Sequence, residues 1–407
     1  MKARGRQSHA RVEVPQGFLF SAGSAGLRRH GSGPDVCLMY STEPARVAAV
    51  FTTNRVKAAP VLVSRDHLKQ SRGVAQAILV NAGNANCATG AAGMRAAREC
   101  AREVGKLLGL GEDQVLVAST GVIGVALDAH VITDQLPALA RRLHPDGYRA
   151  AARAILTTDT RPKVVGRSVR LGKRSVRILG IAKGAGMIYP RLATMLGFLF
   201  TDAAVEPRFL DRALRGVCGE SFNRISVDGD TSTNDAVFLV ANGASGTPRI
   251  GARSAAAGKF LRALSEVAHT LAIELVRDGE GAKRVLEIRV ESAKSEQEAD
   301  AVARSIALSP LVKTAIAGAD PNWGRILSAA GNAGVQIDPG RVNVYINGTL
   351  VCRRGGAAEF SEPAVERALR QKDVLVRVTL GQGKATARFW TSDFTEEYIR
   401  INASYRT

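Results

Sequence analysis

The sequence predicts an α/β fold with a second, smaller α/β domain at the C-terminal end. Strand-like apolar runs alternate with helix-like segments in the N-terminal half, and the alternation starts again after a long helical segment that ends near residue 277. The length of 407 residues also exceeds what one compact core usually holds, so about two domains are expected. We place these domains at residues 1–283 and 284–407.

Short apolar runs predict the strands of the first domain. They are residues 47–51, 61–63, 77–80, 115–118 and 176–182. The segment 91–108 is rich in Ala, Arg and Glu, residues with good helix propensity, and predicts a helix. A second helix is expected over residues 132–142.

Seven basic residues lie between positions 161 and 177 with no acid among them. They are Arg161, Lys163, Arg167, Arg170, Lys173, Arg174 and Arg177. They alternate with apolar residues around a turn-like Gly172, a pattern typical of the solvated face of a β-hairpin. The net charge of +19 leaves a nucleic-acid-binding protein open as an alternative. Because aromatic residues do not interleave and no nucleic-acid module is recognised, we expect no nucleic-acid partner.

The pattern of the second half continues the α/β alternation. An apolar strand is expected directly after residue 194, followed by a helix over 207–216 and a polar loop over 228–235. A long helix over 255–277 precedes Gly279, a plausible C-cap. The C-terminal domain then begins with a strand over 285–290 and a helix over 296–307.

Several classes of protein are disfavoured. No stretch approaches ~18 uninterrupted apolar residues, and the N-terminus lacks the apolar core of a secretory signal, so we expect a cytoplasmic protein with no membrane partner. Five widely spaced cysteines are typical of a reduced compartment. The six histidines form no HxH or HExxH pair, and no metal site is expected. A Walker A loop and a G-x-S-x-G elbow are also missing from the sequence.

The segment 183–196, Lys-Gly-Ala-Gly-Met-Ile-Tyr-Pro-Arg-Leu-Ala-Thr-Met-Leu, is the most informative one. Gly184, Gly186 and the small Ala193 permit a hydroxyl of Thr194 to approach the preceding carbonyl. A Thr at a new N-terminus carries its own base, an α-amine with a pKa near ~7.7–8.0. Although a Thr before an apolar run is commonly an ordinary strand residue, this context favours self-cleavage between Ala193 and Thr194, with Thr194 as the nucleophile.

A second candidate element is the pair Thr120 and Gly121, which follows an apolar run. A hydroxyl and an exposed backbone N–H together can stabilise a developing oxyanion, by a few kcal/mol per donor. The alternative is an ordinary strand-to-helix turn in which Thr120 is an N-cap.

Eight motifs resemble those of one known family. They span residues 119–124, 157–160, 183–188, 193–196, 229–235, 278–282, 318–325 and 401–407. In this order and spacing they resemble the ArgJ family, the ornithine acetyltransferases or glutamate N-acetyltransferases, over nearly the whole chain. The resemblance implies a layered α/β sandwich of the DmpA/ArgJ-like type.

The resemblance also implies roles for individual residues. Ala193 would end an α chain of residues 1–193, and Thr194 would begin the β chain as its nucleophile. Thr120 and Gly121 match the oxyanion hole of the family. Its substrate-binding set matches Thr157, Lys183, Thr194, Glu280, Asn402 and Thr407. The chemistry is suitable, because a Lys pairs with an α-carboxylate and a Glu with an ammonium group.

The implied reaction is a ping-pong transfer of acetyl from N2-acetylornithine to glutamate, which releases ornithine and then N-acetylglutamate for arginine biosynthesis. No metal or organic cofactor is expected, and acetyl-CoA stays open as a second acetyl donor, which would add amino-acid N-acetyltransferase activity. The expected assembly is an α2β2 heterotetramer. A related self-processing N-terminal-nucleophile amidase or aminopeptidase, which passes the acyl group to water, is the alternative. Ala185 and Arg191 depart from the family pattern and could alter the rate of self-cleavage.

Overall fold

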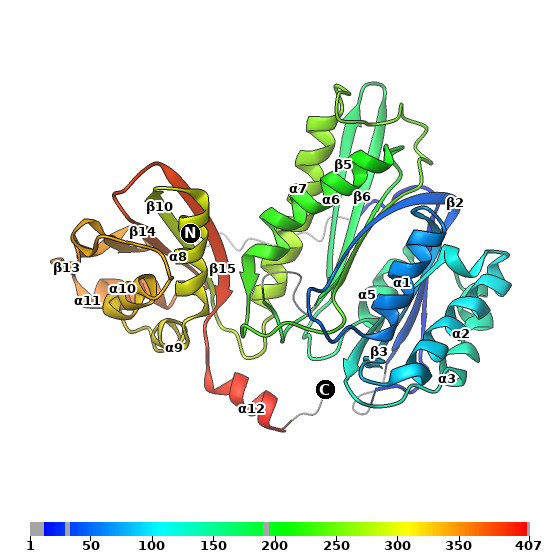
Figure 1. Cartoon of the computed structure of the whole chain (residues 1–407), viewed down its shortest axis with the longest axis horizontal. Helices are drawn as coiled ribbons and strands as arrows, with labels where there is room; N and C mark the ends of the chain where they lie inside the picture. The colour runs from blue at the N-terminus through cyan, green and yellow to red at the C-terminus, as the bar shows by residue number, and fades with distance from the viewer. Residues whose placement is uncertain (1–11, 29–32, 190–194, 405–407) are drawn as a thin grey trace, which may run out of the picture.

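Two β-sheets, each covered by its own helices, lie side by side in the computed structural model, which describes residues 12–28, 33–189 and 195–404 (Figure 1). The first sheet has eight strands in the order β4-β3-β2-β9-β7-β6-β5, with β1 paired to β2. Its strands are β1 (Phe18–Gly23), β2 (Val36–Phe51), β3 (Val74–Asn84), β4 (Val115–Val122), β5 (Lys163–Leu171), β6 (Arg174–Lys183), β7 (Leu196–Thr201) and β9 (Ala236–Ala241). Strand β7 pairs antiparallel with β6 and parallel with β9.

The helices around this sheet bury apolar faces against it. They are α1 (Ala59–Gln70), α2 (Gly90–Leu108), α3 (His130–Thr133), α4 (Leu136–Arg141), α5 (Tyr148–Ala154), α6 (Pro207–Glu220) and α7 (Ala257–Arg277). Helix α7 has one buried apolar face, because its large apolar residues recur every three or four positions. They are Phe260, Leu264, Val267, Leu271 and Leu275, and all are fully buried. This stripe packs over β5 and β6, and β6 ends at Lys183 of the predicted site.

Most of the predicted elements are present, with local errors. The single helix expected over 132–142 is divided into α3 and α4. Residues 61–63 were expected in a strand but lie in helix α1, where Pro60 occupies the first turn and a buried face packs on β4. The β propensity of two valines is therefore overridden by tertiary packing. Gly279 is also not the left-handed cap; Asp278 caps α7, and the glycine with positive φ is Gly281, at +69°.

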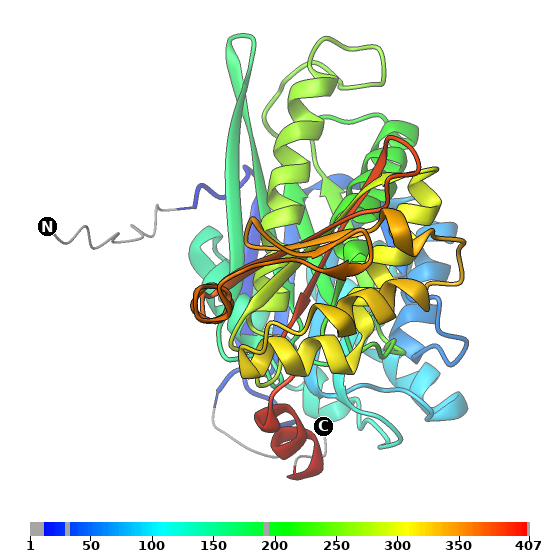
Figure 2. The same ribbon diagram turned by 90° about the vertical axis from the view of Figure 1, so that its left-hand side faces the viewer.

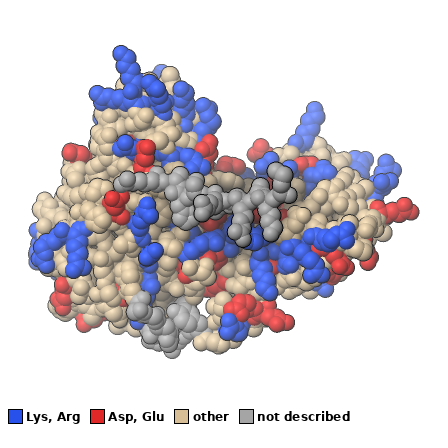
Figure 3. All heavy atoms as spheres, turned by 180° about the vertical axis from the view of Figure 1, so that it is seen from behind, with Lys and Arg blue, Asp and Glu red and all other residues tan. Residues whose placement is uncertain are grey.

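Strands β5 and β6 form the predicted hairpin, which projects from the body of the sheet (Figure 2). Lys and Arg side chains gather at the projecting end (top of Figure 3), where Arg167, Arg170 and Arg174 are exposed. The prediction of a solvated basic face is wrong for Lys163, because its side chain is completely buried at the base of the hairpin.

The second sheet has the order β13-β12-β11-β14-β10-β15-β8. Its strands are β8 (Ile225–Ser226), β10 (Val285–Ala293), β11 (Asn343–Ile346), β12 (Thr349–Arg353), β13 (Gly356–Ala357), β14 (Asp373–Thr379) and β15 (Ala385–Ser392). Its helices are α8 (Glu296–Leu308), α9 (Pro310–Gly318), α10 (Trp323–Gly331) and α11 (Glu362–Leu369). The two-sheet α/β architecture agrees with the predicted fold class.

The last helix, α12 (Glu396–Ser404), leaves the second sheet after β15 and lies near the lower end of the first sheet (Figure 1). The C-terminal segment is thereby brought to the predicted site. Within the described parts of the chain, no helix combines the length and apolar character needed to cross a membrane.

Candidate active site

One pocket brings together every described residue of the predicted site. The residues that line it include Thr120, Gly121, Thr157, Lys183, Gly186, Glu280 and Asn402. They come from five separate regions: the end of β4, the segment after α5, the end of β6 with its following loop, the segment after α7, and helix α12. Ala193, Thr194 and Thr407 lie outside the described residues, so the structure does not place them.

Thr120 and Gly121 lie in β4, and Thr120 is therefore not a helix N-cap. Gly121 has a φ of +130°, and a Cβ there would lie 2.3 Å from the carbonyl carbon of Gly83 on the neighbouring strand. Only glycine tolerates both the backbone conformation and the close strand contact. The backbone at the predicted oxyanion hole is thus fixed by the packing of β3 against β4.

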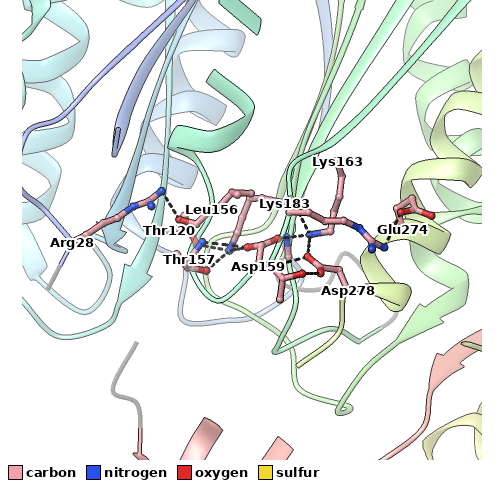
Figure 4. Close-up of polar contacts among 12 residues, drawn as sticks. Arg28, Thr120, Leu156, Thr157, Asp159, Lys163, Lys183, Glu274 and Asp278 are labelled. Atoms are coloured by element: carbon pink, nitrogen blue, oxygen red, sulfur yellow. Dashed lines mark hydrogen bonds and ion pairs between the residues drawn. The ribbon is translucent and has the colours of Figure 1, made fainter. Parts of the chain in front are cut away.

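Lys183, the last residue of β6, joins two threonine hydroxyls. Its Nζ donates to Thr120 Oγ1 at 3.1 Å and to Thr157 Oγ1 at 2.8 Å (Figure 4). A lysine ammonium has no acceptor, so both hydroxyl oxygens must accept. Each hydroxyl hydrogen therefore stays free to be donated elsewhere, which suits Thr120 for stabilising a developing oxyanion.

The electrostatics of Lys183 are set by burial and by Asp159. Burial lowers the pKa of Lys183, and the carboxylate of Asp159, 3.7 Å away, opposes this effect. Burial also raises the pKa of Asp159, but Lys183 and Lys163 outweigh burial and lower it to about 2. Asp159 is therefore an anion at every physiological pH, and it favours the charged form of Lys183.

Arg28 fixes the segment that leads to Thr157. Its Nη2 donates to the carbonyl oxygens of Arg153 at 3.0 Å, Ala154 at 3.2 Å and Leu156 at 2.9 Å (Figure 4). These carbonyls end helix α5, where a cation interacts favourably with the helix dipole.

Glu280 forms the other side of the pocket and is positioned by two hydrogen bonds and by the space beside Gly186. Its backbone N–H donates to the carbonyl of Ala185 at 2.9 Å. Asn402 Nδ2, from α12, donates to Glu280 Oε2 at 2.8 Å. A Cβ at Gly186 would lie 2.6 Å from the Glu280 carboxylate, so the missing side chain of Gly186 makes room for it.

Sequence reasoning did not assign a function to the loop before β9. Asn234 Nδ2 donates to the carbonyl of Ala85 at 2.6 Å and to that of Ser119 at 2.8 Å, and so ties this loop to the strand of the predicted oxyanion hole. Asp235 Oδ1 accepts the backbone N–H of Met195 at 2.9 Å. Both residues belong to the family-like motif at 229–235. This motif marks the loop as part of the site, but it does not show which residues Asn234 and Asp235 contact.

The carboxyl of Asp235 is buried, and burial raises its pKa well above the usual range. Its Oδ2 has no hydrogen-bond partner among the described residues. Since Met195 is bonded directly to Thr194, this carboxyl lies beside the peptide unit that follows the predicted nucleophile. In the described ranges, no group of three His, Cys, Asp or Glu side chains is arranged to hold a metal ion.

Several known proteins resemble this chain over nearly its whole length. A profile of the ArgJ family matches residues 19–407. The arginine biosynthesis bifunctional protein ArgJ of Symbiobacterium thermophilum is 45% identical over 397 residues, which cover 97% of this chain and 98% of that protein. The protein of the same name from Syntrophotalea carbinolica is 45% identical over 392 residues, with coverages of 96% and 99%.

Among solved structures, the arginine biosynthesis bifunctional protein argJ from Bacillus halodurans is similar with a TM-score of 0.51 and 40% identity. The match covers 52% of this chain and 100% of that chain. The profile match and the near-complete coverage of relatives at this identity lead to one conclusion: the chain belongs to the ArgJ family.

Proposed function

We propose that this protein transfers an acetyl group from N2-acetylornithine to glutamate through an acetyl ester on Thr194. Membership of the ArgJ family supports acetyl transfer in arginine biosynthesis and does not favour the amidase alternative. The observation that carries the proposal is the convergence of Thr120, Lys183 and Glu280 on one pocket next to the start of β7.

In the proposed first half-reaction, Thr194 Oγ loses its proton to the Thr194 α-amine and bonds to the acetyl carbonyl carbon. Thr120 Oγ1–H and the Gly121 N–H stabilise the oxyanion, while Lys183 binds the α-carboxylate and Glu280 the side-chain ammonium. The C–N bond breaks, and ornithine leaves with the transferred proton. In the second half-reaction, the amine nitrogen of glutamate bonds to the acetyl carbon and the ester C–O bond breaks. The proton that the amine loses returns through the Thr194 α-amine to Thr194 Oγ, and N-acetylglutamate leaves.

The proposal includes self-cleavage between Ala193 and Thr194. The solved Bacillus halodurans chain is matched completely by 52% of this chain, or about 212 residues. A β chain that spans 194–407 has 214 residues. This agreement in length supports a two-chain product, for which we expect an α2β2 assembly, with domains at 1–283 and 284–407.

The test compares wild type with Thr194→Ala. Wild type is expected to give two bands, one with an N-terminal Thr194, and to form N-acetylglutamate from N2-acetylornithine only when glutamate is present. Thr194→Ala should stay uncut and inactive, whereas Thr270→Ala, at a partly exposed position of helix α7, should behave as wild type. Acetate release that does not depend on glutamate would overturn the transferase proposal in favour of a hydrolase. Glutamate acetylation by acetyl-CoA, measured in the same assay, decides whether acetyl-CoA is a second donor.

A further inference from the structure

A buried cluster of two lysines and two aspartates lies beside the pocket, and we call Lys163, Lys183, Asp159 and Asp278 the lysine–aspartate cluster (Figure 4). Lys163 Nζ lies 2.6 Å from Asp159 Oδ1 and 2.6 Å from Asp278 Oδ2. All four side chains are at most 3% exposed. Lys183 is the one member that lines the pocket described above.

Asp159 connects Lys163 to the side of the pocket that holds Lys183. Its carboxylate accepts the backbone N–H of Gly184 at 2.6 Å and that of Thr157 at 3.2 Å. It also pairs with Lys183 at 3.7 Å. The position of this one carboxylate therefore fixes two pocket residues, Thr157 and Lys183, together with the start of the following loop.

Asp278 connects Lys163 to the opposite side of the pocket. It caps helix α7 and accepts hydrogen bonds from both the backbone N–H and the hydroxyl of Thr160. Glu280 follows two residues later and lines the pocket. Through Asp159 and Asp278, Lys163 consequently connects the segment that carries Lys183 with the segment that carries Glu280.

The charges of the cluster balance, with two cations facing two anions. Removal of one partner from a buried ion pair leaves an uncompensated charge, so each member depends on the others. Such buried networks are a poor source of net stability, and their best-attested contribution is to specify one arrangement. The arrangement specified here is the separation between Lys183 and Glu280.

We propose that Lys163 is a positioning residue that sets the spacing between Lys183 and Glu280 and thereby the length of the amino acid that the pocket accepts. The inference rests on the proposed function, in which these two groups bind the α-carboxylate and the terminal ammonium of the donor. Lys163 touches neither group of the substrate and acts through Asp159 and Asp278.

The first test is chain-length selectivity, measured as the ratio of kcat/KM for N2-acetylornithine to kcat/KM for N2-acetyllysine, which is one methylene longer. One methylene in a fitted pocket changes kcat/KM by roughly 10-fold or more. Lys163→Met should reduce the ratio about 10-fold. Arg161→Met, which removes an exposed cation two residues away that pairs with Glu274, should leave the ratio unchanged.

Lys163→Met leaves two buried carboxylates facing one lysine and could fail to fold. The double variant K163M/D278N removes a neutral pair and keeps the charge of the cluster balanced. It is expected to fold, as measured by circular dichroism and thermal unfolding, and to show the same loss of selectivity, because the bridge is absent.

The second test is the pH dependence of kcat/KM, which general damage to the fold would not shift in a defined direction. Four charged groups face Lys183: Asp159, Glu280 and Asp235 raise its pKa, and Lys163 lowers it against the background of burial. The alkaline limb of kcat/KM should therefore move to higher pH in Lys163→Met and to lower pH in Asp159→Asn. General damage to the fold would not produce shifts of opposite sign.

The outcomes separate this inference from the proposed function. If Lys183→Met and Glu280→Gln leave KM for N2-acetylornithine unchanged, the proposed binding roles fail. If both raise KM but Lys163→Met and K163M/D278N keep wild-type selectivity, and the alkaline limb stays in place, the positioning role of Lys163 is overturned while the proposed function stands.

Discussion

Asp235 Oδ1 accepts the backbone N–H of Met195 at 2.9 Å, so a buried carboxyl from the loop before β9 holds the residue that follows Thr194. Asp235→Ala should remove this acceptor and leave a buried N–H unpaired, a loss of about 1–3 kcal/mol. We expect slower self-cleavage, because the start of β7 is no longer fixed. The fraction of uncut chain on a denaturing gel after timed incubation measures this effect. Asp230→Ala, an exposed position of the same loop, is the control; equal cleavage rates in the two variants would contradict the prediction.

Gly186→Ala should weaken substrate binding. Its new Cβ would lie 2.6 Å from the Glu280 carboxylate, which must then move. We expect KM for N2-acetylornithine to rise about 10-fold, with a smaller change in kcat, since the proposed partner of Glu280 is a part of the substrate that does not react. Gly216→Ala in helix α6 is the matched control, because no atom lies within 4 Å of a Cβ there. An unchanged KM in Gly186→Ala would argue against a substrate contact at Glu280.

Asn234→Ala should affect kcat more than KM. The substitution leaves the carbonyls of Ala85 and Ser119 without this donor, at a cost of about 1–3 kcal/mol each, and it removes the tie between this loop and the strand that carries Thr120. Because an oxyanion develops only in the transition state, imprecise placement of its donors lowers kcat. Steady-state kinetics distinguish this from a binding effect. Asn242→Ala, which removes a similar bond to the carbonyl of Gln16 away from the pocket, should retain wild-type kinetics.

The buried carboxyl of Asp228 should make the free energy of unfolding depend on pH. Its carboxylate accepts the backbone N–H groups of Met187 and Ile188, and burial raises the pKa of Asp228 to about 6 from 3.8. A carboxyl whose folded pKa is raised contributes stability below its unfolded pKa, and the contribution is lost as pH rises through the folded pKa. The free energy of unfolding of wild type relative to Asp228→Asn should therefore fall by up to about 3 kcal/mol between pH 4 and pH 6 and stay constant above.

Urea unfolding of both proteins at several pH values measures this difference, and the comparison cancels the titration of all other groups. A difference that grows with rising pH over the same interval would show that Asp228 is stabilised as an anion in the folded state.

Most of the fold and a large part of the site could be predicted from the sequence. The features that could not be predicted depend on contacts between residues that are far apart in the chain. Strands and helices with clear periodicity, such as α7, were predicted because their buried faces recur along the chain itself. The proposed role of Lys163 could not be predicted, because its partner Asp278 is 115 residues away in the sequence and a run of basic residues is ordinarily solvated. Thr120, Lys183 and Glu280 were found through motifs, whereas Asp159, Asn234 and Asp235 act through contacts that only the folded chain reveals.

The strand order has a consequence for how a cut protein is put together. Strands β7 and β9, which follow residue 194, are inserted between β6 and β2, which precede it. Neither product of the proposed cut would hold the whole first sheet, so the two products would be interleaved within that sheet and not merely docked. Separately refolded halves would each expose two open strand edges, and the uncut chain has to complete the sheet before the peptide bond is broken. The proposed self-cleavage after folding would thus yield an arrangement that collision of two finished halves would not readily form.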